Sequence, residues 1–341
     1  MSTDEAFSQT LKRVAEGTKL DARMSAQAFS AIMSGEVSPA RMAAFLTALA
    51  VRGASVDEIT GAVHAMRGAM RGIAAPAGAI DVCGTGGDGH GTLNISTATA
   101  FVVAACGVPV AKHGNRNMSS KSGAADVLEA LGVRIDLEPR AAEGMLRDTN
   151  FCFLFAPAYH TAMKHVAPIR RELGFRTIFN LIGPLSNPAG ARRQLLGVFG
   201  REWLEPFAQV LAALGTEKAW IVHGSDGLDE LTTTGITHVA VLENGKVSRR
   251  EVSPEDIGLP RATLSQLKGG DAKENAQAIR ALLAGAQGAF RDIVLLNAAA
   301  ALVVADKAGD LSAGAGLAAQ AIDSGRAGEV LARIASYRAL A

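Results

Sequence analysis

Several features that mark common classes of protein are missing from this sequence of 341 residues. Charge of one sign is not in excess, because 34 Lys and Arg face 33 Asp and Glu, a formal net charge of +1. A dedicated nucleic-acid binder usually carries a strong basic excess. Aromatic residues are scarce, with 12 Phe, 2 Trp and 2 Tyr, so stacking platforms for single strands are not expected. The composition therefore argues against a nucleic-acid partner.

Cysteines and long apolar runs are also few. Cys83, Cys106 and Cys152 cannot all pair and lack metal-ligand spacing, so we expect reduced thiols. The longest apolar stretch, residues 293–305, contains Asn297 and is too short to cross a bilayer. The first residues show no apolar segment of a secretory signal. We therefore expect a cytoplasmic protein without a membrane contact.

The first part of the chain has the pattern of helices. Up to residue 72, apolar residues recur three and four positions apart, the spacing of amphipathic helices. Ser38 before Pro39 marks one helix start, and Ser55 with Glu58 forms a capping-box pattern at another. We predict a small helical N-terminal domain over residues 1–72.

From Ile80 onward, short apolar segments alternate with helical patterns. This alternation predicts a mostly parallel sheet with helices on both faces, and we expect a large α/β domain over residues 73–341. Residues 161–190 break the alternation, and we expect about 162–188 of them to return to the N-terminal helices and complete the helical domain. A ligand cleft would then lie between the two domains.

The densest signal for chemistry is the segment GTGGDGHGTLNIST, residues 84–97. Its clustered glycines let backbone N–H groups approach an anion closely, and Asn94, Ser96 and Thr97 add donors where a helix begins. We predict a cradle for a phosphate or diphosphate, because a merely flexible turn needs fewer glycines. Asp88 inside it would repel phosphate unless a cation or a ribose hydroxyl lies between them.

The same segment also matches the dinucleotide motif G-x-G-x-x-G through Gly84, Gly86 and Gly89. Such a site expects an acidic residue about 20 positions later, at the end of the next strand. Lys112 and His113 stand there instead. A nicotinamide site is therefore disfavoured, and the absence of a Walker lysine motif disfavours a P-loop nucleotidase.

A second polar loop, KHGNRNMSSKSG, follows the next predicted strand. It combines the cations Lys112, Arg116 and Lys121 with serine hydroxyls. The alternative for these basic residues is a solvated surface loop. Two anion loops after adjacent strands predict a ligand with two separated phosphate groups, such as a phosphoribosyl diphosphate.

Two further segments supply charges. Asp229 and Glu230 in the segment DGLDEL are oxygen ligands of the kind that Mg²⁺ takes beside a diphosphate, although an N-capping acidic turn is the alternative. Arg170, Arg171 and Arg176 lie on a predicted helix beside the cleft. One of them could orient a carboxylate bidentately, or each could form surface salt bridges. We expect three lone histidines to be structural: His160, His165 and His223.

In this order, the segments GTGGD, NIST, KHGNR, RTIFNLIGPLSNPA and GLDEL resemble the anthranilate phosphoribosyltransferase family of tryptophan biosynthesis. The resemblance covers nearly the whole chain. It implies a fold of the nucleoside phosphorylase/phosphoribosyltransferase type and usually a homodimer joined through the helical parts. It also implies Mg²⁺-dependent transfer of the 5-phosphoribosyl group from 5-phosphoribosyl 1-diphosphate to the amino group of anthranilate, with release of diphosphate.

The resemblance assigns roles to individual residues. It implies that Ser96, Asp229 and Glu230 bind Mg²⁺, and we expect Lys112 and Asp88 to be catalytic. The residues that would hold the phosphoribosyl donor are Gly84, Gly87, Asp88, Thr92, Asn94, Ile95, Ser96, Thr97, Lys112, His113, Gly114, Asn115, Arg116, Asn117, Met118, Ser119 and Ser120. The implied anthranilate contacts are Asn115, Gly183 and, for the carboxylate, Arg170.

Two positions depart from the pattern of the family. Ala124 stands where a serine is expected, and Thr161 replaces a usual proline. Neither change removes a charged group, so we expect altered affinity and an unaltered reaction. Two rivals remain: a pyrimidine-nucleoside phosphorylase, which uses inorganic phosphate, and a non-catalytic relative that binds nucleic acid. The acidic pair Asp229 and Glu230 and the net charge disfavour the second, and the segments LGFRTIFN and GLDEL disfavour the first.

Overall fold

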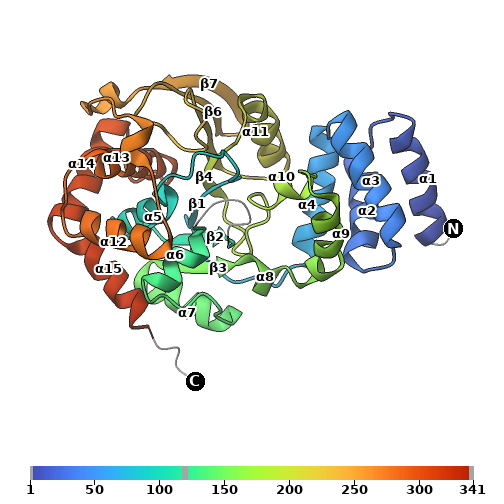
Figure 1. Ribbon diagram of the computed structural model, residues 1–341, viewed down its shortest axis with the longest axis horizontal. Coiled ribbons are helices and arrows are strands. Elements are labelled where there is room, and N and C mark those ends of the chain that lie inside the picture. The colour runs from blue at the N-terminus through green and yellow to red at the C-terminus, as the bar shows by residue number, and fades with distance from the viewer. Residues whose placement is uncertain (1–2, 117–121, 338–341) are drawn as a thin grey trace.

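The computed structural model describes residues 3–116 and 122–337. Asn117, Met118, Ser119 and Ser120, predicted to hold the donor, lie outside the described residues. The described part has a helical group at one end and a larger α/β body around a central sheet (Figure 1). None of its helices is both long and apolar enough to cross a membrane.

The N-terminal region is helical, as predicted. Its helices are α1 (Thr3–Ala15), α2 (Ala22–Met33), α3 (Pro39–Arg52) and α4 (Val56–Ala69). Both predicted starts are confirmed, since α3 begins at Pro39 and the Ser55–Glu58 capping box precedes α4. Glu58 is fully buried and also accepts the N–H of Leu20 over 2.9 Å, so the cap fastens α4 to the chain before α2.

The sheet has seven strands in the order β3-β2-β1-β4-β5-β6-β7. Their bounds are β1 (Ile80–Gly84), β2 (Val110–Gly114), β3 (Phe151–Phe155), β4 (Arg193–Gly197), β5 (Lys218–Gly224), β6 (Thr237–Glu243) and β7 (Lys246–Val252). The first five are parallel, and β6 and β7 are antiparallel. The prediction of a mostly parallel sheet is confirmed. The apolar pattern of the sequence did not predict β7, because the residues of this strand are mostly polar and are exposed apart from Val252.

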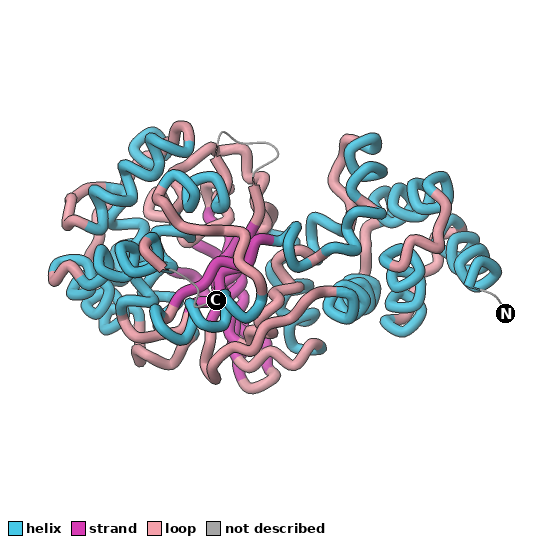
Figure 2. The backbone as a smooth tube through the Cα atoms, turned by 90° about the horizontal axis from the view of Figure 1, so that it is seen from below, coloured by secondary structure: helices cyan, strands magenta, loops and turns pink. Residues whose placement is uncertain are grey.

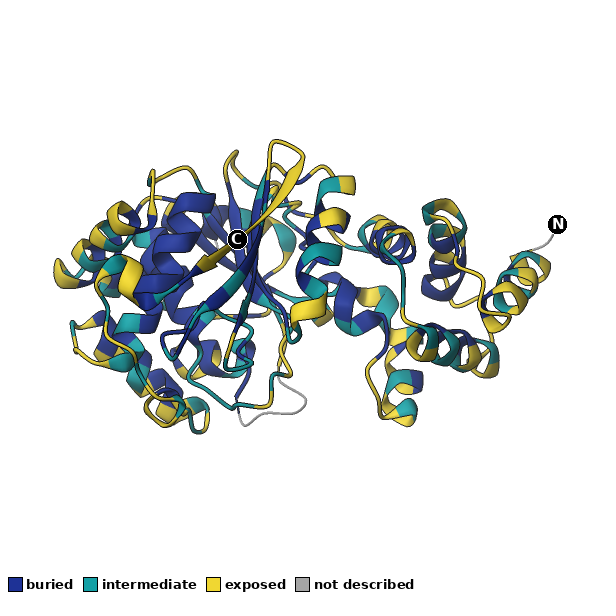
Figure 3. Ribbon diagram, turned by 90° about the horizontal axis from the view of Figure 1, so that it is seen from above, coloured by how far each residue is buried: buried dark blue, intermediate teal, exposed yellow. Residues whose placement is uncertain are grey.

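Helices cover both faces of this sheet. The bounds of the helices in and around the α/β body are α5 (Ile95–Ala105), α6 (Ala124–Ala130), α7 (Pro139–Thr149), α11 (Leu204–Ala213), α12 (Ala272–Leu283), α13 (Ala289–Val304), α14 (Leu311–Asp323) and α15 (Arg326–Ala335). In Figure 2 the strands run between the helices of the C-terminal half and the helices nearer the N-terminus. Apart from the exposed β7, the strands form the buried centre of the larger body (Figure 3).

Alternating side chains of the strands fill two apolar cores. Val82 and Leu195 point into the core formed with α5 and α13, whereas Cys83 and Leu196 belong to the core on the other face. This second core is continuous from α11 to the buried residues of α1–α4, for example Phe45. The helical region is therefore joined to one face of the sheet by contiguous apolar packing.

Residues 156–185 leave the sheet and pack on the N-terminal helices. They contain α8 (Ala156–Tyr159), a 3₁₀ turn, α9 (Ala167–Leu173) and α10 (Phe179–Ile182). α9 contacts α3 and α10 contacts α4, and the rings of Phe29 and Phe179 lie 5.7 Å apart. This segment therefore packs on the N-terminal helices. The division into a helical domain of residues 1–72, completed by about 162–188, and an α/β domain over 73–341 stays a prediction.

Candidate active site

The glycine-rich loop begins where β1 ends and is held by the acidic loop after β5. Gly86 N–H donates to Asp229 Oδ2 over 2.7 Å. Gly84 is required by this approach, because a Cβ atom there would lie 2.4 Å from the same oxygen. The carboxyl ends of parallel strands meet at one edge of a sheet, which explains how segments 143 positions apart come together.

Three carboxylates gather at this junction. Glu230 Oε1 accepts the N–H of Ser96 over 3.1 Å at the start of α5, and Asp88 lies within hydrogen-bonding range of Asp229. The surrounding protein desolvates the carboxyl group of Asp229 and, together with Asp88, raises its pKa to about 7. Desolvation and the charge of Asp229 raise the pKa of Glu230 well above its ordinary value. Desolvation thus disfavours the negative charge of these carboxyl groups unless a cation lies beside them.

This charge suits a divalent cation. No group of three or more His, Cys, Asp or Glu side chains, within residues 3–116 and 122–337, is arranged to hold a metal ion on its own. Mg²⁺ commonly takes one or two carboxylates and completes its shell with substrate phosphate and water. Asp229 and Glu230 fit that requirement, because their carboxyl groups lie at the glycine-rich loop and at the start of α5, where they accept the N–H groups of Gly86 and Ser96.

Lys112 lies beneath the loops and is 2% exposed. Its Nζ donates to the carbonyl of Val82 over 2.6 Å and to Ser96 Oγ over 3.1 Å. Burial lowers the pKa of this ammonium, and Asp81, Cys83 and the acidic pair act in the opposite direction. The structure therefore places Lys112 behind Ser96 instead of on an open surface.

The N-terminus of α5 contributes the other donors of the cradle. Asn94 precedes the helix, and its Oδ1 accepts Asn275 Nδ2 over 2.8 Å. Thr97 is fully buried, and its hydroxyl has no hydrogen-bond partner among the described residues. Thr92 forms an isolated bridge with Lys268. Asn275 and Lys268 were missed in the sequence because nothing in their local pattern indicates a contact with a loop more than 170 positions away.

His113 lies near the end of β2, just before the second polar loop, and its ring is buried. His113 Nε2 lies 3.2 Å from His160 Nε2, so each ring is packed against the other. Desolvation lowers the pKa of His113 to about 3 and that of His160 to about 4. Both imidazoles are therefore neutral at pH 7. His160, expected to be structural, is a direct neighbour of a predicted site residue.

Arg116 and Asn115 are exposed at the end of the described part of this loop. Arg116 Nη1 pairs with Asp126 Oδ1 at 2.8 Å and with Glu129 Oε2 at 2.6 Å. The guanidinium thus pairs with two carboxylates of α6. The methyl group of Ala124, one of the two departures from the family pattern, lies beside Gly114.

The arginines of the returning segment have different surroundings. Arg170 on α9 is half-buried, lies over the ring of Phe179 at 5.7 Å and reaches Asn180 Oδ1 at 3.5 Å. Burial lowers the pKa of Arg170. Arg171 is exposed. Arg176 donates to the carbonyl of Gly87, which ties the glycine-rich loop to the returning segment.

Gly183 is placed close to the histidine pair. Its backbone accepts a hydrogen bond from the ring of His113. The guanidinium of Arg176 also lies over the Phe199 ring at 4.1 Å, which fixes this side chain between the loop and the carboxyl end of β4. The sequence singled out Arg176 only as one of three arginines, and the structure shows that it contacts the glycine-rich loop.

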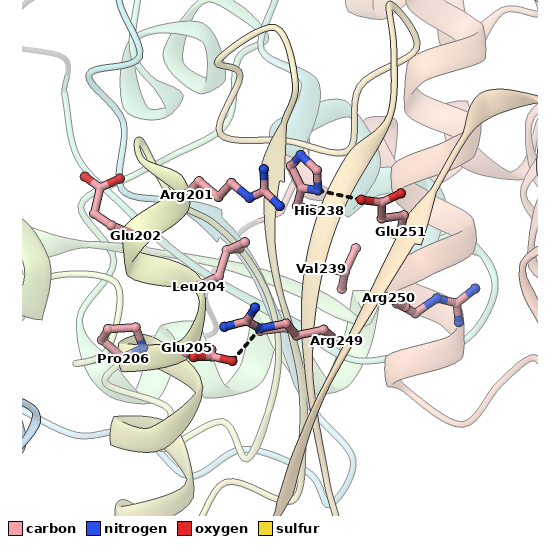
Figure 4. A pocket seen from close by; sticks show the side chains of 11 residues that line it. Arg201, Glu202, Leu204, Glu205, Pro206, His238, Val239, Arg249, Arg250 and Glu251 are labelled. Carbon is pink, nitrogen blue, oxygen red and sulfur yellow. Dashed lines mark hydrogen bonds and ion pairs between the residues drawn. The ribbon is translucent and has the colours of Figure 1, made fainter.

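A cavity of about 480 Å³ shares no residue with this cluster. It lies between the start of α11 and the β6–β7 hairpin. Two ion pairs line it, Arg249 with Glu205 and His238 with Glu251, whereas Arg201, Glu202 and Arg250 form no ion pair among the described residues (Figure 4). Its lining contains none of the segments that the sequence singled out for chemistry. The acidic cluster and the two loops remain the candidate site.

This arrangement of a helical bundle, a mostly parallel sheet and an acidic loop facing a glycine-rich loop is that of a two-domain glycosyltransferase. Residues 8–70 match the helical bundle domain of the glycosyl transferase family, and residues 77–328 match its a/b domain. An anthranilate phosphoribosyltransferase of Rhodopseudomonas palustris strain HaA2 is 57% identical over 335 residues, which are 98% of this chain and 99% of that protein. The chain belongs to the anthranilate phosphoribosyltransferase family.

Solved structures agree with this assignment. The crystal structure of anthranilate phosphoribosyltransferase from Thermus thermophilus superposes with a TM-score of 0.91 at 44% identity, covering 96% of this chain and 98% of that one. The enzyme from Saccharomyces cerevisiae, solved in complex with PRPP and Mg, has a TM-score of 0.86 at 28% identity, with coverage of 96% and 97%. The rival assignments are therefore set aside.

Proposed function

We propose that this chain transfers the 5-phosphoribosyl group of 5-phosphoribosyl 1-diphosphate to the amino group of anthranilate at the junction of the two loops and the acidic pair. The observation that carries the proposal is the contact of Asp229 and Glu230 with the glycine-rich loop and with the start of α5. A cradle for phosphate and a pair of metal-ligating carboxylates thereby occupy one place, as a diphosphate substrate requires.

The donor would bind through its two phosphate ends. Backbone N–H groups of Gly84 and Gly87 and the N-terminus of α5, from Asn94 to Thr97, offer donors for the diphosphate. The loop after β2 would take the 5-phosphate. Ser96, Asp229 and Glu230 would hold Mg²⁺, which when bound supplies positive charge against the diphosphate.

Catalysis would rest on charge and alignment. Bond breaking at the anomeric carbon gives the ribose positive charge and the leaving diphosphate negative charge. Lys112 would contribute its buried positive charge from behind Ser96. Asp88 would lie on the side of the ribose, where positive charge develops. The amine of anthranilate is neutral at pH 7 and needs no strong base. Holding both substrates in line can be worth up to about 7–11 kcal/mol of barrier.

Anthranilate would lie between the sheet and the returning segment. Arg170 is the candidate for its carboxylate, because it projects from α9 and its only polar side-chain partner within residues 3–116 and 122–337 is the 3.5 Å contact with Asn180. Asn115 and Gly183 would contact the ring and amine. Arg170 is also partly desolvated, which strengthens a charged hydrogen bond to a carboxylate.

The assembly and location complete the proposal. We place the chain in the cytoplasm, as a homodimer joined through its helical domain, with domains at residues 1–72 plus about 162–188 and over the rest of 73–341. The dimer is what the resemblance to the family implies.

The fluorescence of anthranilate, which is lost on ribosylation, tests the reaction. Purified protein is mixed with anthranilate, 5-phosphoribosyl 1-diphosphate and Mg²⁺, with a chelator as one control and omission of each substrate as others. Decay that needs all three components supports the proposal. A flat trace from folded protein would refute it, and release of a free base from a pyrimidine nucleoside and phosphate would favour the nucleoside phosphorylase instead.

A further inference from the structure

The hydrogen-bond ladder between β1 and β2 stops before the two strands reach the site. β1 pairs with β4 along all five of its residues but with β2 only through Ile80 and Val110. In a parallel ladder of this register, the next step joins the Val82 carbonyl to the His113 N–H and the Ala111 carbonyl to the Val82 N–H. Side chains take these groups instead, and this happens only between the strands whose loops form the candidate site.

Two of these side chains come from the strands themselves. Lys112 Nζ donates to the Val82 carbonyl over 2.6 Å. The N–H of His113 donates to Asp81 Oδ1 over 3.2 Å. Asp81 is fully buried and Lys112 is 2% exposed, so both occupy space inside the sheet and not on its surface. Because they stand where main chain would meet main chain, the strands cannot close on each other.

The third side chain, that of Asn187, comes from the loop between α10 and β4. Asn187 Nδ2 donates to the Ala111 carbonyl over 2.8 Å, and Asn187 is 3% exposed. Asp81 and Asn187 thus hold two main-chain groups of β2, the His113 N–H and the Ala111 carbonyl, and together these two contacts form a bridge to β2. Asn187 Oδ1 accepts the N–H of Ala189 over 2.8 Å, which fixes the turn that presents this side chain.

We propose that Asp81 and Asn187 are positioning residues that keep the carboxyl ends of β1 and β2 apart and thereby set the spacing of the loops that follow them. The inference rests on the proposed function, in which these two loops hold the two phosphate ends of one donor. Without the bridge, the backbone groups of Val82, Ala111 and His113 would pair across the strands, and the loops would move together. The two loops would then lie too close together to hold the two phosphate ends of the donor.

The test compares donor and acceptor requirements in variants of the full chain. Asn187→Leu keeps the volume and removes the hydrogen bonds, and Asn187→Ala serves if the leucine variant does not fold. Thr149→Val is the matched control, because Thr149 is equally buried and its hydroxyl donates to the carbonyls of Met145 and Phe151 at the opposite, amino end of β3. Affinity for 5-phosphoribosyl 1-diphosphate with Mg²⁺ is measured by calorimetry, KM for anthranilate by fluorescence, and Tm for each protein.

We expect the Asn187 variants to bind the donor about tenfold more weakly, the effect of a lost buried hydrogen bond, with KM for anthranilate within about twofold of the parent value. Thr149→Val should lower Tm without a change in donor affinity. Equal losses for donor and acceptor, or a fall in Tm alone for the Asn187 variants, would overturn the inference. Asp81→Asn keeps an acceptor for the N–H of His113 and should therefore lose less affinity for the donor than Asp81→Leu. Equal losses of donor affinity in the two variants would overturn the role of Asp81.

The parent protein separates this inference from the proposed function. If the parent binds no donor, the proposed function fails. The inference about the gap then fails with it, since no spacing of phosphate loops is left to set. If the parent binds the donor and the variants bind it equally well, only the positioning role is lost.

Discussion

The paired histidines, His113 in β2 and His160 directly after α8, predict how the stability of the fold depends on pH. His113 and His160 are 6% and 5% exposed, and their pKa values of about 3 and about 4 lie below the ordinary 6.5. Below about pH 6.5, the unfolded chain therefore binds protons at these two histidines that the folded protein does not bind. The stability contributed by the neutral pair is complete above pH 6.5 and is lost as the pH falls toward 4.

The magnitude follows from the two shifts. Between pH 8 and pH 5, protonation of each histidine in the unfolded chain costs about 2 kcal/mol, so the pair costs about 4 kcal/mol. His160→Gln removes one of the two groups and keeps a polar side chain beside His113. The variant should therefore lose about 2 kcal/mol less than the parent over this interval, whatever its absolute stability.

Urea denaturation followed by circular dichroism at pH 8 and pH 5 measures this difference. His64→Gln is the control, because His64 lies on the exposed face of α4, and it should show the pH dependence of the parent. If His160→Gln loses as much stability between the two pH values as the parent does, the buried pair is not the source of the acid sensitivity and the reasoning fails.

Three shorter predictions concern the site. Arg170→Ala should raise KM for anthranilate more than tenfold and leave donor affinity within about twofold, because the lost group is a charged hydrogen-bond donor; equal losses would contradict its role. Glu230→Gln should abolish the Mg²⁺-dependent decay of anthranilate fluorescence while the circular dichroism spectrum is unchanged, and retained turnover in chelator-free buffer would exclude the metal role. Gly197→Ala would place a Cβ 1.5 Å from the carbonyl of Asp229, so it should displace the acidic loop and lower both Tm and kcat, whereas an unchanged kcat would show that this loop tolerates movement.

Much of the site could be predicted because parallel strands bring their carboxyl ends together. The glycine-rich loop and the acidic pair were predicted from local composition, and the topology then places them in contact. The capping box at Ser55 was equally local, since its two partners are three positions apart. Each of these features depends on neighbouring residues or on a general rule of sheet architecture.

The remaining features depend on contacts that local patterns do not encode. Nothing near Asn187 indicates that its amide reaches a strand carbonyl 76 positions earlier. Arg116 was expected at a phosphate because its loop is basic, but Asp126 and Glu129 on the next helix compete for the same guanidinium. Lys112 was expected to be catalytic, but nothing in its local pattern indicates that its ammonium reaches the Val82 carbonyl and the Ser96 hydroxyl.

The packing of Phe179 against Phe29 has a consequence for synthesis of the chain on the ribosome. The apolar core around α1–α4 also contains Leu185 and residues as late as Leu242, so the first four helices leave the ribosome well before their core can be completed. At about 5–20 residues per second, the delay is on the order of 10 s. During that time the apolar faces of these helices are exposed to solvent, and a nascent chain stalled between residues 70 and 185 would be a target for chaperones and proteases.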